Sequence, residues 1–134
     1  MIDLKNLTIE KAHEALKKGD FSCRELSEAY LDAIKKKNTE LNAYLEIYDD
    51  VLLQADNAQK KFKDGTATVL TGIPFAIKDN ILIEGRIASA SSKILGNYRA
   101  SYDATVIKDL KKVGAVFLGR TNMDEFAMGS STQT

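Results

Sequence analysis

A short apolar segment that ends on a lysine most constrains how this chain can fold. The segment is G-I-P-F-A-I-K-D-N-I at residues 72–81. A glycine and a proline bound its apolar part, and an apolar run of this length between such residues is typical of a buried strand. We therefore predict a buried strand here, with Lys78 at its carboxyl end, where a loop can carry chemistry.

Three amphipathic helical patterns come before this segment. The first spans residues 8–18 and ends at Gly19. The second begins at the S-C-R-E sequence of residues 22–25, a capping box in which the serine and glutamate side chains each bond a free backbone N–H. The third begins near residue 49, after an extended or irregular connection over 42–48. Because amphipathic helices must bury their apolar stripes, these helices are expected to pack on one another or on a sheet.

A strand, a helix and a second strand are predicted in the second half of the chain. Asp103 is expected to cap a fourth helix, and Gly119 to end a buried strand over 115–118. This order indicates a βαβ-like unit with parallel strands. Since functional residues collect at the carboxyl ends of parallel strands, Lys78 and the residues 120–122 should lie close together.

The predicted fold class is α/β, with N-terminal helices followed by the first strands of a mixed sheet. We expect one domain over 1–134, helical over 1–65 and α/β over 66–134, with no separate second domain. The counts of Lys+Arg and Asp+Glu are both 19, so the net charge is zero, which argues against a nucleic-acid surface. No apolar run approaches the roughly 18 residues of a membrane span. The N-terminus lacks the organisation of a signal peptide, so a cytoplasmic location is predicted.

Several candidate residues have more than one interpretation. Ser89, Ser91 and Ser92 lie in a small-residue loop that lets the backbone approach a ligand or another segment, although an ordinary polar loop is the simpler interpretation. The single cysteine, Cys23, excludes an internal disulfide and is interpreted as a small buried hydrophobe. The only histidine, His13, receives no functional role.

Two further patterns carry little functional weight. The adjacent acids Asp124 and Glu125 suggest acid–base chemistry or metal binding only weakly, because an acidic first turn of a helix is the commoner meaning. The chain contains neither G-x-G-x-x-G after a strand nor G-x-x-x-x-G-K-[ST]. The sequence therefore gives no support to a nucleotide-binding domain.

Two blocks carry a resemblance to a known family: G-I-P-F-A-I-K-D-N-I at 72–81 and G-R-T-N-M-D-E-F-A-M-G-S-S at 119–131. The chain resembles the amidase signature family and, within it, the A-subunit branch that serves tRNA-dependent amidotransferases. The likeness extends over the whole chain, including the capping-box helix. It covers the N-terminal part of such a protein.

The resemblance implies a serine amidase with an α/β/α fold and a Ser–cis-Ser–Lys triad. Lys78 matches the family's catalytic lysine, which takes a proton from the bridging serine and so activates the nucleophilic serine. Both serines of that signature lie beyond Thr134. The serines at 89, 91, 92, 130 and 131 do not match them, and none is assigned as the nucleophile. The 134-residue chain alone is therefore predicted to be inactive.

The same resemblance implies a substrate and partners. Glutamine would be hydrolysed, and its ammonia would pass to a partner subunit that converts Glu-tRNA(Gln) to Gln-tRNA(Gln). ATP and Mg²⁺ would be used by that partner, with no cofactor or metal site in this chain. The B and C subunits of the amidotransferase are the expected protein partners, giving a heterotrimer, and tRNA is expected to contact the B subunit.

Two alternatives stay open. In the first, Lys78 is a strand-end lysine that is paired with Asp79 or exposed to water, and the chain is a noncatalytic folded piece. The other alternative is a different hydrolase of the amidase signature family.

Overall fold

The computed structural model describes residues 2–132 and consists of four α-helices around a three-stranded sheet. Helices α1 (Ile9–Lys18) and α2 (Cys23–Leu41) lead to strand β1 (Tyr44–Ile47). Helix α3 (Val51–Lys63), strand β2 (Pro74–Lys78), helix α4 (Thr105–Val113) and strand β3 (Val116–Thr121) follow. Single turns of 3₁₀ helix, η1 and η2, lie at Lys93–Leu95 and Glu125–Ala127.

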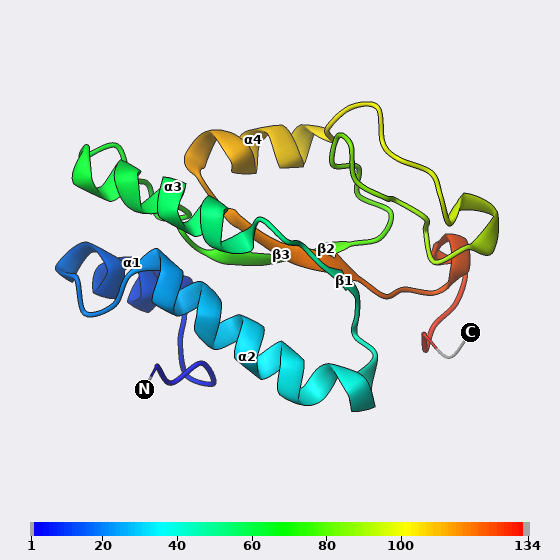
Figure 1. The fold of residues 1–134 in the computed structure, drawn as a ribbon, viewed down its shortest axis with the longest axis horizontal. Coiled ribbons are helices and arrows are strands. Elements are labelled where there is room, and N and C mark those ends of the chain that lie inside the picture. Colours follow the sequence, from blue (N-terminus) through cyan, green and yellow to red (C-terminus); the bar gives the residue numbers. More distant parts are fainter. Residues whose placement is uncertain (1, 133–134) are drawn as a thin grey trace.

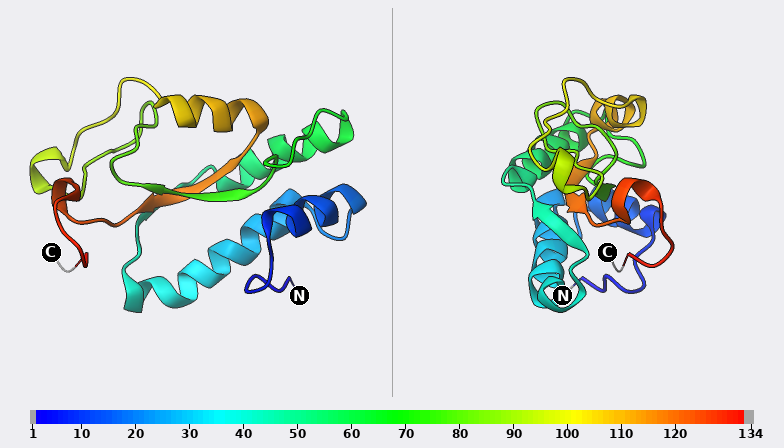
Figure 2. Two further views of the ribbon diagram at one scale, coloured as in Figure 1. Left: turned by 180° about the vertical axis from the view of Figure 1, so that it is seen from behind. Right: turned by 90° about the vertical axis from the view of Figure 1, so that its right-hand side faces the viewer.

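The sheet is mixed, as predicted, with strand order β1-β3-β2. β2 and β3 are parallel, whereas β1 runs antiparallel to β3. Helix α4 lies on one side of the strands, and α1 and α2 lie on the other (Figures 1 and 2). The described part of the chain thus has helices on both sides of its sheet, as the sequence-based α/β assignment requires.

The stretch 42–48 contributes more than a connection, because it supplies the edge strand β1. Gly119 makes this pairing possible. A Cβ at Gly119 would collide with the backbone carbonyl oxygen of Glu46 in β1. The prediction that Gly119 ends the second strand is therefore wrong: β3 continues to Thr121 because the glycine admits a neighbouring strand at close range.

Local signals correctly predicted several helix ends. Ser22 and Glu25 form the complete capping box of α2. Gly19 and Gly114 adopt the left-handed conformation at the ends of α1 and α4. Cys23 is fully buried, and burial raises the pKa of its thiol to about 11, as expected of a packing residue.

The predicted cap of the fourth helix is wrong. Residue Ala104 occupies the N-cap of α4, and no side chain caps it. The Asp103 carboxylate instead accepts hydrogen bonds from the backbone N–H of Glu84 and from Lys111 Nζ, both at 2.8 Å. Asp103 therefore ties the β2–α4 connection to α4 rather than starting the helix.

Candidate active site

Lys78 is the last residue of β2, and its partner in the parallel pairing with β3 is Thr121. The carboxyl ends of β2 and β3 therefore meet at one edge of the sheet, which confirms the predicted proximity of Lys78 to residues 120–122. The Lys78 side chain is exposed, whereas its neighbours Ile77 and Asp79 are buried. β2 thus ends at Lys78, as predicted, but only Ile77 of its five residues is buried, so the prediction of a buried strand is wrong.

Asp79 follows Lys78 and is 1% exposed. Its carboxylate accepts hydrogen bonds from the backbone N–H of Ser89 and Ser91 at 3.0 and 2.7 Å, from Ser89 Oγ at 2.5 Å, and from Arg120 Nη1 at 2.8 Å. Burial acts to raise the pKa of Asp79, but the hydrogen bonds from Ser89, Arg120 and Ser91 outweigh it and hold the pKa below its ordinary value. Asp79 therefore carries a stabilised negative charge.

The noncatalytic alternative gave Lys78 two states, paired with Asp79 or exposed to water, and the structure contradicts only the pairing. Within residues 2–132, the ion pair of Asp79 is made with Arg120. The Asp79 side chain is buried in this ion pair, whereas the Lys78 side chain is exposed. Lys78 is left exposed to solvent in this part of the chain.

Arg120 joins this carboxylate to the edge strand. Its side chain is 13% exposed and donates from Nε to Glu46 of β1 at 3.2 Å, in addition to its bond to Asp79. Burial acts to lower the pKa of Arg120, but Asp79 and then Glu46 outweigh it and raise the pKa above its ordinary value. Arg120 therefore links all three strands at the carboxyl end of β2 and β3.

The small-residue loop at 88–92 is packed against this ion pair. Four of its five residues are buried, so the interpretation of this loop as an ordinary polar loop is wrong. Its backbone approaches another segment of the chain, since the N–H of Ala90 donates to the carbonyl of Asp79 at 3.0 Å. Ala90 and Ser91 have φ values of 49° and 52°, a left-handed conformation that costs an ordinary residue free energy.

The segment after β3 lies beside this loop (Figure 1). The Ser91 hydroxyl donates to Asn122 Oδ1 at 3.1 Å, and the Ser92 hydroxyl donates to Glu125 Oε1 at 2.7 Å. The backbone N–H of Phe126 donates to the carbonyl of Ala90 at 3.0 Å. Phe126 is also left-handed, with a φ of 52°, so two strained segments hold each other at the end of the sheet.

The adjacent acids Asp124 and Glu125 do not act as a pair. Asp124 accepts from the backbone N–H of Thr132 at 2.6 Å, whereas Glu125 accepts from Ser92. Across residues 2–132, no group of three or more His, Cys, Asp and Glu side chains is placed to hold a metal ion. The same residues contain no helix long and apolar enough to cross a membrane.

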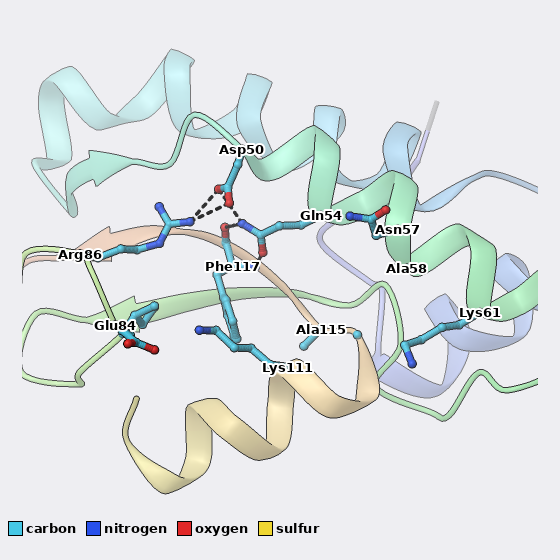
Figure 3. A pocket seen from close by; sticks show the side chains of 12 residues that line it. Asp50, Gln54, Asn57, Ala58, Lys61, Glu84, Arg86, Lys111, Ala115 and Phe117 are labelled. Atoms are coloured by element: carbon cyan, nitrogen blue, oxygen red, sulfur yellow. Dashed lines mark hydrogen bonds and ion pairs between the residues drawn. The ribbon is translucent and has the colours of Figure 1, made fainter. Parts of the chain in front are cut away.

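A separate cleft of about 340 Å³ lies between α3, α4 and the turn at 83–86 (Figure 3). Arg86 donates twice to Asp50 at 2.8 Å and lies over the ring of Tyr48, 3.7 Å from its centre. Gln54 bonds both Asp50 and the backbone of Phe117. Lys78 does not line this cleft, and the polar groups at its Arg86 end bond one another, so it is a second ionic site rather than part of the first.

The sequence singled out Lys78 and placed residues 120–122 near it, but it did not indicate that Asp79 pairs with Arg120 or that Glu46 joins them. A signal was present for Asp79, since an acid at a buried strand end requires a donor. Its partner is 41 residues away, and nothing local in the sequence indicates that Arg120 is the donor.

A mixed sheet with helices on both sides and a lysine at the carboxyl end of a strand define a class of α/β protein with its candidate site at the sheet edge. The amidase family profile matches residues 25–134, and the chain belongs to this family.

The relatives of this chain include A subunits of glutamyl-tRNA(Gln) amidotransferases from two bacteria. The chain is 46% identical over 133 residues to the A subunit of the glutamyl-tRNA(Gln) amidotransferase of Thermoanaerobacter pseudethanolicus, covering 98% of this chain and 27% of that protein. It is 44% identical to the protein of the same name from Acinetobacter baumannii, again over 27% of that protein. The chain thus spans about a quarter of the length of these relatives.

Solved structures confirm the fold. The peptide amidase of Stenotrophomonas maltophilia superposes with a TM-score of 0.87 at 30% identity, over 92% of this chain and 26% of that one. The A subunit of the glutamyl-tRNA(Gln) amidotransferase of Thermotoga maritima gives a TM-score of 0.75 at 36% identity, over 99% and 27%.

Proposed function

We propose that this chain supplies the catalytic lysine, Lys78, of a subunit that hydrolyses glutamine for a tRNA-dependent amidotransferase. The observation that carries the proposal is the position of Lys78, exposed at the carboxyl end of β2, in a chain 44–46% identical to amidotransferase A subunits. Carboxyl ends of parallel strands are where open α/β sheets place their reactive groups.

In the proposed reaction, Lys78 acts as a base. Its uncharged amine takes the proton of a bridging serine, which takes the proton of a second serine as that hydroxyl attacks the side-chain amide carbon of glutamine. The C–N bond breaks, the proton returns to the leaving nitrogen, and ammonia and a glutamyl ester result. Water then hydrolyses the ester to glutamate. Both serines are proposed to lie beyond Thr134, in the part of the relatives that this chain does not cover.

The partners are proposed on the same basis. The ammonia would be used by a partner B subunit, with a C subunit completing a heterotrimer, to convert Glu-tRNA(Gln) to Gln-tRNA(Gln) in the cytoplasm. ATP and Mg²⁺ would be used by that partner subunit.

A second candidate is hydrolysis of another amide. It is favoured by the superposition on a peptide amidase, whose fold this chain shares closely. Lys78 would have the same role in either reaction. The substrate therefore distinguishes the two, and glutamine and a peptide amide should be compared in one assay.

The test is replacement of Lys78 in the complete subunit that carries these residues. Both Lys78→Ala and Lys78→Arg should lower ammonia release from glutamine by about 100-fold or more, because general-base catalysis is lost and arginine does not deprotonate. Ammonia is measured with a coupled dehydrogenase, and thermal unfolding checks that the fold persists.

Lys108→Ala is the matched control, because Lys108 is another exposed lysine and lies on α4, away from the sheet edge. Its activity should equal that of the unmodified enzyme. Ammonia release from Lys78→Ala at close to the unmodified rate would show that Lys78 is not the base.

A further inference from the structure

The connection between β2 and α4, residues 79–104, is long and contains only one 3₁₀ turn among its residues. Connections of this length without regular structure are uncommon and are usually functional. Two aspartate–arginine pairs anchor it: Asp79 bonds Arg120 of β3 near its start, and Arg86 bonds Asp50 at the N-terminus of α3. A third ion pair, between Asp103 and Lys111, ties its end to α4. The two aspartate–arginine pairs differ in their neighbours: Asp79 directly follows Lys78, whereas Asp50 and Arg86 line the cleft beside α3.

The first anchor, Asp79, follows Lys78 directly, in the turn after β2. The backbone N–H of Asp79 donates to the carbonyl of Thr121 at 3.2 Å, and the N–H of Ile81 donates to the carbonyl of Lys78 at 2.9 Å. Arg120 is the β3 partner of Ile77, and its guanidinium donates to the Asp79 carboxylate at 2.8 Å. The buried Asp79 side chain thus fixes the turn that begins directly after Lys78, and with it the end of the strand from which Lys78 projects.

The same carboxylate holds the strained loop. The Asp79 carboxylate accepts hydrogen bonds from the backbone N–H groups of Ser89 and Ser91 and from the Ser89 hydroxyl. The same loop bonds Asn122, Glu125 and Phe126. Left-handed alanine, serine and phenylalanine residues persist only where the surroundings hold them. Without the carboxylate, the buried donors at 89 and 91 would lose their acceptor and both segments would relax.

We propose that Asp79 and Arg120 are positioning residues, which fix the direction of Lys78 and the place of the segments 88–92 and 122–127 beside it. The inference rests on the proposed role of Lys78 as a base. A base must lie within hydrogen-bonding reach of its proton donor, and a displacement of about 1 Å can cost about 100-fold in rate. The buried pair thus acts through Lys78 without touching substrate.

The experiment compares two pairs of variants in the complete subunit. Asp79→Asn and Arg120→Gln should each lower kcat for glutamine hydrolysis by about 10- to 100-fold, with KM within about 3-fold, because the chemical step loses its alignment while binding contacts remain. Arg120→Lys keeps the charge but not the fork that reaches both Asp79 and Glu46, so it should recover part of kcat.

Asp50→Asn and Arg86→Gln are the matched controls, since they break an ion pair that anchors the same connection away from Lys78. Their kcat should stay within about 3-fold of the unmodified value. An equal loss of kcat in these controls, or an unchanged kcat in Asp79→Asn, would overturn the inference.

If Asp79→Asn or Arg120→Gln fails to fold, Ser89→Ala still tests the inference, because it removes only a single hydroxyl donor to Asp79. It should lower kcat by about 3- to 10-fold at unchanged KM, and an unchanged kcat would again overturn the inference. Failure of the proposed function looks different: Lys78→Ala would then retain activity. An inactive Lys78→Ala variant together with a fully active Asp79→Asn variant would contradict only the positioning role of Asp79 and Arg120.

Discussion

Two aspartate–arginine pairs anchor the β2–α4 connection, and they differ chiefly in burial. The side chains of Asp79 and Arg120 are 0% and 13% exposed, whereas those of Asp50 and Arg86 are 38% and 22% exposed. Asp79 also accepts three hydrogen bonds from the loop that it holds. The other pair lies at the cleft lined by α3 and α4 (Figure 3), and its Arg86 also stacks on the ring of Tyr48.

This difference in burial means that the two aspartate–arginine pairs contribute different amounts to the free energy of unfolding. Water screens the Asp50–Arg86 pair, so losing one partner leaves a charge that solvent can reach. Water does not reach the Asp79 carboxylate, so loss of its arginine leaves a buried charge with hydrogen bonds alone to stabilise it. We therefore expect the Asp50–Arg86 pair to contribute little to stability and the Asp79–Arg120 pair to contribute much more at the sheet edge.

The largest expected effect is on stability. Arg120→Ala should lower the free energy of unfolding by about 3–5 kcal/mol, the usual cost of breaking a buried pair. Arg86→Ala should lower it by about 1 kcal/mol, since its partner is exposed. Urea denaturation of each variant measures both values. Equal losses would show that burial does not separate the two pairs.

The pH dependence of stability should separate the two aspartates next. Burial acts to raise the pKa of each, but Ser89 and Arg120 outweigh it for Asp79, and Arg86 and Gln54 outweigh it for Asp50, so both pKa values are lowered in the folded state. A lowered pKa gives stability that is complete above the unfolded-state value of about 3.9 and is lost as the pH falls through the folded-state value.

The unfolding free energy should therefore decrease as the pH is lowered below about 4. Asp79→Asn should flatten this decrease more than Asp50→Asn, because the Asp79 carboxylate has more hydrogen bonds to lose. Unfolding free energies from about pH 6 to about pH 3 test this order. A steeper acid dependence in Asp79→Asn than in the unmodified chain would contradict it.

The smallest expected effect is the change in unfolding free energy on replacing Tyr48, whose ring lies against the Arg86 guanidinium. Tyr48 is 4% exposed, and burial raises the pKa of its hydroxyl to about 12 against the opposing charge of Arg86. Tyr48→Phe keeps the ring and should change the unfolding free energy by less than about 0.5 kcal/mol. Tyr48→Leu should lose a further amount of about 0.5–1 kcal/mol, the usual worth of a cation–π contact at a partly exposed site.

Thermal unfolding of both tyrosine variants in the Arg86→Ala background is the control. The difference between phenylalanine and leucine should disappear there, since no cation remains over the ring. A difference that persists would show that ring packing, and not the contact with Arg86, distinguishes the two side chains.

Much of the helical part could be predicted because its signals are local. The capping box at 22–25 has both members within one turn, and the glycines after α1 and α4 need only their own conformational freedom. Asp103 shows where such reasoning stops. A carboxylate before a helix usually caps it, yet a lysine two turns later and a backbone N–H from residue 84 compete for it.

The sheet edge could be predicted only in part. An apolar run that ends on a lysine was sufficient to predict a strand and to single out Lys78. The pairing of β1 with β3 was not predictable, because four residues of edge strand carry a weak local pattern and their partners lie more than 70 residues away. The partner of Asp79 was missed for the same reason.

The sequence by itself determined several helix ends, the strand that carries Lys78 and the family of the chain, since these depend on neighbouring residues or on motifs of fixed spacing. Tertiary structure alone decided which charges are buried. It buried Asp79 against Arg120 and left the neighbouring Lys78 exposed, because residues 41 positions apart are brought together only when the strands pair.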